Sequence, residues 1–551
     1  MLAVIKGSVL RDAIISGANL IENKKRSVDE LNIFPVPDGD TGTNMSMTMS
    51  AARKELMQMT DDEPAGVVAG KAASALLRGA RGNSGVITSL LFRGFSKGLK
   101  GVEEANGSDL ANALTLGVEA AYKAVMKPTE GTILTVGRVA AERGRVAAGF
   151  NNDANYVWDE ICNAAEDALE TTPELLPVLK RAGVVDAGGQ GLCYIFRGMQ
   201  SVFRDGIIAA SEVTDTAAAQ GDVDSFKSTV AQFDEVINFT YCTEFIVEKE
   251  NDNDPAKLRA YLESIGDCVV VVDDEEIIKV HVHTNQPGDA ITRGLTYGSL
   301  ISNKIENMRK QHENAGAGAA AQKKFERVDP VEGEVGFVAV AAGDGLISLF
   351  HDLGCENVVS GGQTMNPSTE DILEAVQATP AETVFVLPNN KNIIMAAEQA
   401  IPLADRKVVV LPTRTIPQGL TAMLAYAPDN SVDENAVDMY KAAEKVGTGQ
   451  ITYAARNSEF NDRKIKEGEL LGLVNGKLTF TEKSRSKAIA KLAKQMVTKN
   501  SSFITLIYGE DVTDDEAEET RKYIETKIAK NVEVTLVNGG QPVYYYILSV
   551  E

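Results

Sequence analysis

Two carboxylates that stand two residues apart are the first candidates for chemistry in this sequence. The run Asp-Gly-Asp-Thr-Gly begins at Asp38, and in an extended turn Asp38 and Asp40 can approach one hard cation from the same side. Thr41, Thr43 and Asn44 add hydroxyl and amide groups just before a stretch with helical spacing, and a helix N-terminus attracts phosphate. The run predicts a site where magnesium and polyphosphate meet, although an isolated Asp-Gly-Asp is more often a surface turn.

Further segments rich in glycine and hydroxyl groups interrupt the helical patterns. They lie at 79–85, 128–135 and 183–191, and we expect each to be a loop that joins two helices. The first offers backbone donors and a hydroxyl suited to phosphate, from Gly82, Asn83, Ser84 and Gly85. In a helical barrel, loops at one end can converge on a ligand although they lie far apart in sequence. These segments therefore predict one common rim.

Two of the four histidines stand together on a predicted strand. His281 and His283 share one face of the strand at 277–283, because side chains alternate along a strand. Cys242, on another predicted strand, could complete a zinc site whose fourth ligand is unidentified or a water, and Cys268 is the nearest alternative ligand. Paired histidines on a surface are also commonly just solvated. Both interpretations stay open on the spacing alone.

The elements that must hold these groups fall into three parts. Helical apolar spacing with glycine-rich breaks indicates that the first part is all-α. The second part combines short strands with one helical pattern, and the third alternates buried strands with helical runs, so both are α/β. The predicted organisation is a helical domain at 1–207, a linker at 208–226, a small α/β domain at 227–312, a linker at 313–330 and an α/β domain at 331–551.

Composition excludes several classes of protein. The formal net charge of -23 over 551 residues argues against a nucleic-acid surface, because phosphate binding needs clustered basic residues. No window approaches the roughly 18 apolar residues that a membrane span needs, and we see no signal peptide, so a cytoplasmic protein is expected. Five cysteines without short repeated spacings are expected to be reduced thiols.

The motifs together resemble a known family. Leu-Asn at 31–32, Pro-Val-Pro-Asp-Gly-Asp-Thr-Gly-Thr-Asn-Met at 35–45 and the glycine-rich 79–85 resemble the nucleotide-binding subunit of dihydroxyacetone kinases, which implies a helical barrel for the first domain. The Pro-Val-Pro form, Gly-Thr-Ile-Leu-Thr at 131–135, Gly-Val-Val-Asp-Ala-Gly-Gly at 183–189 and His-Val-His resemble the catalytic subunit of bacterial fatty acid kinase. This second resemblance covers essentially the whole chain.

The resemblance implies a set of site residues. Asp38 and Asp40 would be the catalytic carboxylates that hold two magnesium ions on ATP, with Asn32 as a third ligand where dihydroxyacetone kinases carry an aspartate. It also implies a structural zinc ion on the middle domain, at Cys242, His281 and His283. Phosphate would be contacted by Thr41, Thr43, Asn44, Gly82, Asn83, Ser84 and Gly85, and the nucleotide rim would include Thr132, Asp186 and Gly188.

The resemblance also implies an activity. It is that of an ATP-dependent kinase that phosphorylates the carboxylate of a fatty acid, held by a separate fatty-acid-binding protein, to give acyl phosphate for phospholipid synthesis. The third domain resembles the DegV-like fold of fatty-acid-binding proteins, and we expect it to serve partner docking or homodimer formation. The alternatives are a kinase for a small hydroxyketone such as dihydroxyacetone, and a zinc-bearing scaffold without catalysis.

Overall fold

The chain folds into two compact units. One comprises Met1–Thr216 together with Phe325–Glu551, and the other is Ala217–Lys324. The computed structural model describes residues 3–32, 40–125, 128–211, 241–251, 253–273, 277–307, 325–362, 365–460, 463–499, 501–530 and 532–551. The linkers predicted at 208–226 and 313–330 fall largely outside these ranges, so the predicted domain boundaries stay predictions.

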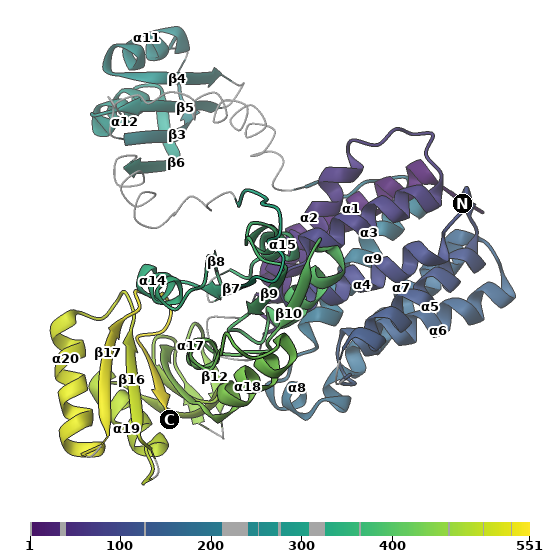
Figure 1. The fold of residues 1–551 in the computed structure, drawn as a ribbon. Coiled ribbons are helices and arrows are strands. Elements are labelled where there is room, and N and C mark those ends of the chain that lie inside the picture. The colour runs from purple at the N-terminus through teal and green to yellow at the C-terminus, as the bar shows by residue number, and fades with distance from the viewer. Residues whose placement is uncertain are drawn as a thin grey trace. The chain divides into compact units, whose positions relative to one another are not determined.

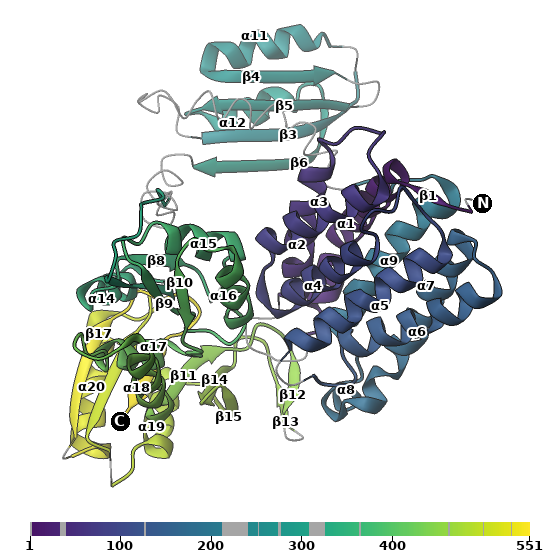
Figure 2. The same ribbon diagram turned by 45° about the vertical axis from the view of Figure 1, so that its right-hand side comes forward.

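The N-terminal part of the larger unit is a bundle of helices that lie side by side (Figures 1 and 2). The predicted helical architecture is confirmed, with the addition of one short antiparallel pair of strands that an all-α prediction does not include. The elements are β1 (Ile5–Lys6), α1 (Gly7–Asp29), α2 (Thr41–Leu56), α3 (Ala65–Gly79), α4 (Gly82–Gly98), β2 (Glu104–Ala105), α5 (Gly107–Ala124), α6 (Ile133–Phe150), α7 (Ala154–Leu175), α8 (Pro177–Ala182) and α9 (Ala187–Asp205).

Small residues allow these helices to approach closely. A Cβ atom added to Gly94 of α4 would lie 2.2 Å from the carbonyl oxygen of Leu116 on α5. A Cβ added to Gly198 of α9 would lie 2.6 Å from the Cα of Gly17 on α1. Since neither neighbour is the end of a flexible side chain, a larger residue would force the backbones apart. The many Ala and Gly residues of this domain therefore set the spacing of the bundle.

The glycine-rich segments predicted as interhelical loops are in large part the first turns of helices. α4 begins at Gly82 and α9 at Ala187, so most of the glycines in question are helical. A Cβ added to Gly85 would lie 2.3 Å from the Oγ1 atom of Thr48, on α2. The predicted loops are confirmed at 80–81, 128–132 and 183–186. The prediction is wrong for the helical glycines of these segments, which serve close helix packing rather than chain reversal.

In its described residues, the smaller unit is an antiparallel sheet with two helices. Its strand order is β4-β5-β3-β6, and every described pairing in it is antiparallel. The apolar side chains of Phe245, Ile278 and Val280 form its core with residues of the first helix. The elements are β3 (Tyr241–Lys249), α11 (Pro255–Ile265), β4 (Gly266–Asp273), β5 (Ile277–Thr284), α12 (Pro287–Gly294) and β6 (Gly298–Asn307).

The C-terminal domain begins with a parallel α/β lobe. Its sheet has the order β10-β9-β7-β8 and is parallel throughout the described pairings. The two central strands, β7 and β9, are almost fully buried, as expected for a parallel sheet between helices. The lobe contains β7 (Val335–Ala341), α14 (Asp344–Asp352), β8 (Asn357–Ser360), α15 (Thr369–Gln377), β9 (Thr383–Leu387), α16 (Ile394–Ala400), the 3₁₀ helix η1 (Ile401–Leu403), β10 (Lys407–Val410), α17 (Ile416–Leu424) and α18 (Val432–Lys445).

A second lobe, coloured towards yellow in Figure 1, completes this domain. Its main sheet has the order β15-β14-β11-β18-β16-β17, and a separate hairpin joins β12 to β13. The multidomain α and α/β fold class is thereby confirmed. The elements are β11 (Gly447–Tyr453), β12 (Ser458–Phe460), β13 (Arg463–Ile465), β14 (Leu470–Val474), β15 (Lys477–Glu482), α19 (Arg485–Met496), β16 (Phe503–Tyr508), α20 (Asp514–Tyr523), the π-helix η2 (Ile524–Ile528), β17 (Glu533–Asn538) and β18 (Tyr546–Val550).

The parallel lobe packs directly on the helical bundle within the larger unit. α15 contacts α3 and α16 contacts α4, and the buried apolar residues of the bundle and of this lobe form one continuous core. A backbone bridge pairs Arg81 with Ser368. Among the helices that the structure describes, none is long and apolar enough to cross a membrane.

Candidate functional site

The start of α2 is held by a carboxylate from the end of α1. The Oδ1 atom of Asp29 accepts hydrogen bonds from the backbone N–H groups of Gly42 (2.7 Å) and Thr43 (3.2 Å). Its Oδ2 atom accepts a hydrogen bond from the Thr43 hydroxyl at 2.7 Å. A negative charge at a helix N-terminus is stabilised by the helix dipole. Asp29 therefore fixes the first turn of α2, and no local motif in the sequence links it to that turn.

Asn32 lies beside this turn. Its Oδ1 atom accepts a hydrogen bond from the Thr41 hydroxyl at 3.0 Å, and its Nδ2 atom donates to the Asp29 carbonyl at 3.1 Å. The side-chain oxygen of Asn32 is thus close to the first residue of α2. Its predicted role as a magnesium ligand stays a prediction, and Asp38 lies outside the described residues.

Asp40, the residue before α2, is contacted from the C-terminal domain. The Nδ2 atom of Asn366 donates to the Oδ2 atom of Asp40 at 2.7 Å. Arg81, which precedes α4, donates from Nη1 to the Asn366 carbonyl at 2.8 Å. Because Asn366 is 326 positions away from Asp40, spacing along the chain gives no signal for this contact.

The first turns of α2 and α4 lie against each other. A Cβ added to Gly82 would lie 2.5 Å from the Nδ2 atom of Asn44, and Gly82 has a φ of +57°, which favours glycine. The Nδ2 atom of the adjacent Asn83 reaches the Oδ1 atom of Asn392 at 3.4 Å. The Oδ1 atom of Asn83 is buried without a hydrogen-bond partner among the described residues. A buried acceptor of this kind can receive a donor from a ligand or a water.

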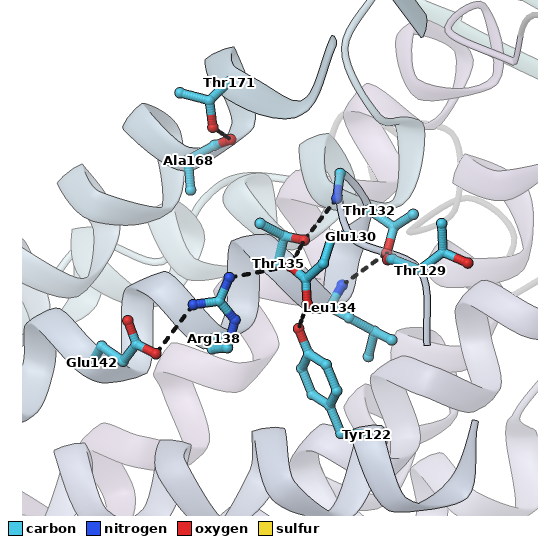
Figure 3. Close-up of polar contacts among 11 residues, drawn as sticks. Tyr122, Thr129, Glu130, Thr132, Leu134, Thr135, Arg138, Glu142, Ala168 and Thr171 are labelled. Carbon is cyan, nitrogen blue, oxygen red and sulfur yellow. Dashed lines mark hydrogen bonds and ion pairs between the residues drawn. The ribbon is translucent and has the colours of Figure 1, made fainter. Parts of the chain in front are cut away.

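A network around Glu130 holds the segment before α6 (Figure 3). The carboxylate of Glu130 accepts hydrogen bonds from the hydroxyls of Tyr122 (2.9 Å) and Thr135 (2.7 Å) and from Nη2 of Arg138 (3.1 Å). The hydrogen bond from Thr135 is the main reason why the pKa of Glu130 is below its usual value. Thr132, the N-cap of α6, donates to the carbonyl of Thr129 at 2.7 Å. The network therefore sets the position of Thr132 at the helix start.

Asp186 caps the start of α9. Its Oδ2 atom accepts a hydrogen bond from the backbone N–H of Gly189 at 2.7 Å, and its own N–H donates to the Thr172 hydroxyl at 3.1 Å. Burial of the carboxyl group raises the pKa of Asp186 to about 6, although backbone N–H groups favour the charged form. A Cβ added to Gly188 would lie 3.2 Å from the Cβ of Ile133, so α9 and α6 begin side by side.

The helix starts that carry the predicted residues lie at one end of the bundle. α2 meets α4 at Gly82, α9 meets α6 at Gly188, and a Cβ added to Gly191 of α9 would lie 2.6 Å from the Met45 sulfur of α2. Four helix dipoles thus direct their positive ends toward the same rim. The structure therefore brings together the described residues that were predicted from the separate segments. Helix N-termini favour bound anions, and a cation can offset the carboxylates of Asp29, Asp40 and Asp186 at the same helix starts.

The donors at the start of α2 suit a hard cation. They are the carboxylate of Asp40 and, close to it in sequence and structure, the hydroxyl and amide oxygens of Thr41 and Asn32. Charged and neutral oxygen ligands are those that Mg²⁺ prefers, and Mg²⁺ commonly keeps waters and substrate phosphates as further ligands. Within the described ranges, no three side chains of His, Cys, Asp or Glu come together to hold a metal ion. These residues fit a magnesium ion that shares its ligands with a nucleotide.

The residues predicted to hold zinc lie on paired strands of the smaller unit. In the β3–β5 register Cys242 pairs with His283, and Glu244 pairs with His281. The side chains of Cys242, His281 and His283 are outside the described part of the structure. The backbone register is compatible with a shared site, and the zinc site itself stays a prediction.

Comparison with known proteins assigns each part of the chain to a family model. A DAK2 domain matches residues 35–201, the FakA-like middle domain of fatty acid kinase matches residues 238–315, and the FakA-like C-terminal domain of fatty acid kinase matches residues 336–551. Protein YloV of Bacillus subtilis (strain 168) is 40% identical over 551 residues, which cover 99% of each protein.

Two solved structures show more distant likenesses. The DegV family protein of Corynebacterium glutamicum is 14% identical, with a TM-score of 0.31 and coverage of 39% of this chain and 95% of that one. The dihydroxyacetone kinase from C. freundii, in complex with AMP-PNP and Mg²⁺, is 18% identical, with a TM-score of 0.29 and coverage of 36% of this chain and 35% of that one.

Proposed function

Since the chain belongs to the FakA-like family of fatty acid kinases, we propose that it transfers the γ-phosphoryl group of ATP to the carboxylate of a fatty acid. The product would be an acyl phosphate, and we propose that it serves phospholipid synthesis. The resemblance stated from the motifs is confirmed by the family models, and kinase-type phosphotransferase chemistry follows from the DAK2 domain.

The observation that carries this proposal is the convergence of helix N-termini beside Asp40. Phosphoryl transfer asks a protein mainly to position the reactants and to neutralise the charge of the phosphates. The N-termini of α2, α4, α6 and α9 supply positive dipole ends at one rim, and Asp40 supplies a charged oxygen ligand there. This combination suits a magnesium-bound polyphosphate better than it suits an uncharged ligand.

The residues of the chain then take distinct roles. Asp40, with Asp38 and Asn32 as its expected companions, would hold magnesium, which when bound supplies charge neutralisation of the phosphates. Phosphate oxygens would be bound and oriented by the first turns of α2 and α4, with Thr41, Thr43, Asn44, Gly82, Asn83, Ser84 and Gly85. The Thr43 hydroxyl donates a hydrogen bond to Asp29 in the structure, so it would give up that bond in order to donate to a phosphate oxygen. Thr132, Asp186 and Gly188 would line the nucleotide rim.

The acceptor is proposed to arrive on another protein. The family model describes one subunit of fatty acid kinase, which implies a second component, and we propose that this component is a fatty-acid-binding protein that carries the acyl substrate. Homodimer formation, a cytoplasmic location and a structural zinc ion at Cys242, His281 and His283 remain predictions. Zinc analysis of the purified protein and of Cys242→Ser tests the last of these, because loss of a ligand should reduce the bound zinc.

One experiment tests the proposed reaction. The full chain is incubated with labelled ATP, Mg²⁺ and either oleate loaded on a fatty-acid-binding protein or dihydroxyacetone. Labelled acyl phosphate is expected with the loaded carrier, and Asp40→Asn should abolish it. If a panel of loaded carriers gives no acyl phosphate, the fatty acid acceptor is wrong. If dihydroxyacetone is phosphorylated instead, the protein is a small-molecule kinase.

A further inference from the structure

The contact between Asn366 and Asp40 joins the C-terminal domain to the proposed kinase site. We propose that Asn366 is a positioning residue of that site: its amide orients the Asp40 carboxylate for the magnesium ion of the nucleotide complex. The inference rests on the proposed function, because it takes Asp40 to be a metal ligand. It adds that the site is incomplete without a segment of the C-terminal α/β lobe.

Asn366 is shielded from solvent and contacts Asp40 directly. It lies between β8 and α15, and only 4% of its surface is exposed. Its Nδ2 atom donates to the Oδ2 atom of Asp40 at 2.7 Å. A buried hydrogen bond to a charged acceptor is stronger than one between neutral groups. The amide therefore has the burial and the geometry to fix the carboxylate.

The kinase domain and α15 together hold the backbone of Asn366. Arg81 donates from Nη1 to the Asn366 carbonyl at 2.8 Å, and its Nη2 atom lies 3.4 Å from the Oδ2 atom of Asp371. The carboxylate of Asp371 also accepts from the backbone N–H of Ser368 at 2.7 Å, in a capping box that begins α15. The backbone N–H of Thr369 donates to the carbonyl of Ala80 at 3.1 Å. These bonds leave Asn366 little freedom to move relative to Arg81.

The amide also lies beside the phosphate-binding turns. A Cβ added to Gly82 would lie 3.4 Å from the Nδ2 atom of Asn366 and 2.5 Å from that of Asn44. The side chain of Asn44 from α2 and the backbone of Gly82 from α4 therefore meet the C-terminal segment at one point. The contact is thus built into the centre of the site, and it is not a peripheral bond between domains.

A neutral donor is the appropriate partner for a carboxylate that must also bind a cation. A neutral amide, unlike a cationic donor, leaves the negative charge of the Asp40 carboxylate in place for a metal ion. Partners that orient a metal-binding carboxylate typically contribute 10- to 100-fold to metal affinity or activity. We therefore expect loss of the amide to weaken magnesium binding while nucleotide binding without the metal is preserved.

Calorimetry with the full chain tests this role. AMP-PNP is titrated at a series of Mg²⁺ concentrations into wild type, Asn366→Ala, Arg81→Met and Glu370→Gln. Asn366→Ala should raise the Mg²⁺ concentration for half-maximal nucleotide affinity about 10- to 100-fold. Arg81→Met should raise it in the same direction, because it releases the Asn366 backbone. Glu370→Gln is the matched control, since it removes an exposed contact between the same two domains, with Arg78 at 3.9 Å.

The outcomes separate the inference from the proposed function. A half-maximal Mg²⁺ concentration that is unchanged in both Asn366→Ala and Arg81→Met overturns the positioning role. An equal loss of nucleotide affinity with and without Mg²⁺ also overturns it, because that result indicates a general structural defect. If wild type itself binds no magnesium nucleotide, the proposed function fails first. Thermal melting in metal-free buffer verifies that each variant is folded. If Asn366→Ala does not fold, the result for Arg81→Met decides whether Asn366 has the positioning role.

Discussion

The hydroxyl of Thr135 stabilises the segment before α6, so its removal tests how much that segment contributes to the stability of the protein. The residue is only 2% exposed, and its hydroxyl accepts a hydrogen bond from the backbone N–H of Gly131 at 2.8 Å and donates to Glu130 at 2.7 Å. Figure 3 shows Thr135 beside Glu130 in this network. Thr135→Val keeps the shape of the side chain and removes both bonds.

The size of the effect follows from these two losses. An unsatisfied buried N–H costs about 1–3 kcal/mol, and a hydrogen bond to a charged group contributes about 1.5–3 kcal/mol. Glu130 is half-exposed, so the second contribution falls at or below the low end of its range. We expect Thr135→Val to lower the free energy of unfolding by about 2–4 kcal/mol. For a domain of about 150–250 residues this corresponds to a melting temperature lower by about 4–16 °C.

The assay is thermal unfolding of wild type, Thr135→Val and a matched Thr→Val control. Thr115 of α5 is suitable, because its hydroxyl donates to the carbonyl of Ala111 in its own helix at 2.8 Å. Thr115→Val should change the free energy of unfolding by no more than about 0.5 kcal/mol. In the background of Glu130→Gln, Thr135→Val should cost less, with a coupling energy of about 0.5–3 kcal/mol. The reasoning is refuted if Thr135→Val melts as the control does, or if the two sites show no coupling.

The remaining predictions concern packing, thiol reactivity and pH. Gly94→Ala should destabilise the bundle by about 1–3 kcal/mol or more, because the added Cβ would lie 2.2 Å from a backbone oxygen of α5. The change should appear as a lower midpoint of unfolding in urea. An unchanged midpoint would show that the helices can separate without cost. Burial raises the pKa of the thiols of Cys193 and Cys355 to about 12, so iodoacetamide should label neither in the native protein at about pH 8, as read by mass spectrometry; rapid labelling would contradict their burial. Burial raises the pKa of Asp186 to about 6, so between about pH 4 and 6 the folded state binds more protons than the unfolded state. Wild type should therefore lose stability relative to Asp186→Asn as the pH rises through this range. Denaturant midpoints measure this difference, and a midpoint difference that changes in the opposite direction would contradict the expected sign.

The sequence by itself determined the classes of structure and the chemistry of the main motif. Helical spacing around small residues indicates an all-α domain, and buried strands that alternate with helical runs indicate an α/β domain, because these periods follow from local backbone geometry. Asp38 and Asp40 are two residues apart, so their potential to share a cation is also a local property. The same local argument failed at the glycines that lie inside helices. Glycine permits both a turn and a close helix contact, and only the packed neighbour, Thr48 at Gly85, shows which applies.

Tertiary structure alone decided which distant groups meet. The carboxylate of Asp29 reaches the amides of Gly42 and Thr43, and Asn366 reaches Asp40 across 326 positions of chain. No periodicity encodes such contacts, because they depend on how whole helices and lobes pack, which is set by the sum of many buried surfaces. The acidic residues therefore indicate a cation site from the sequence. The contact between Asn366 and Asp40 depends on how the C-terminal lobe packs on the bundle.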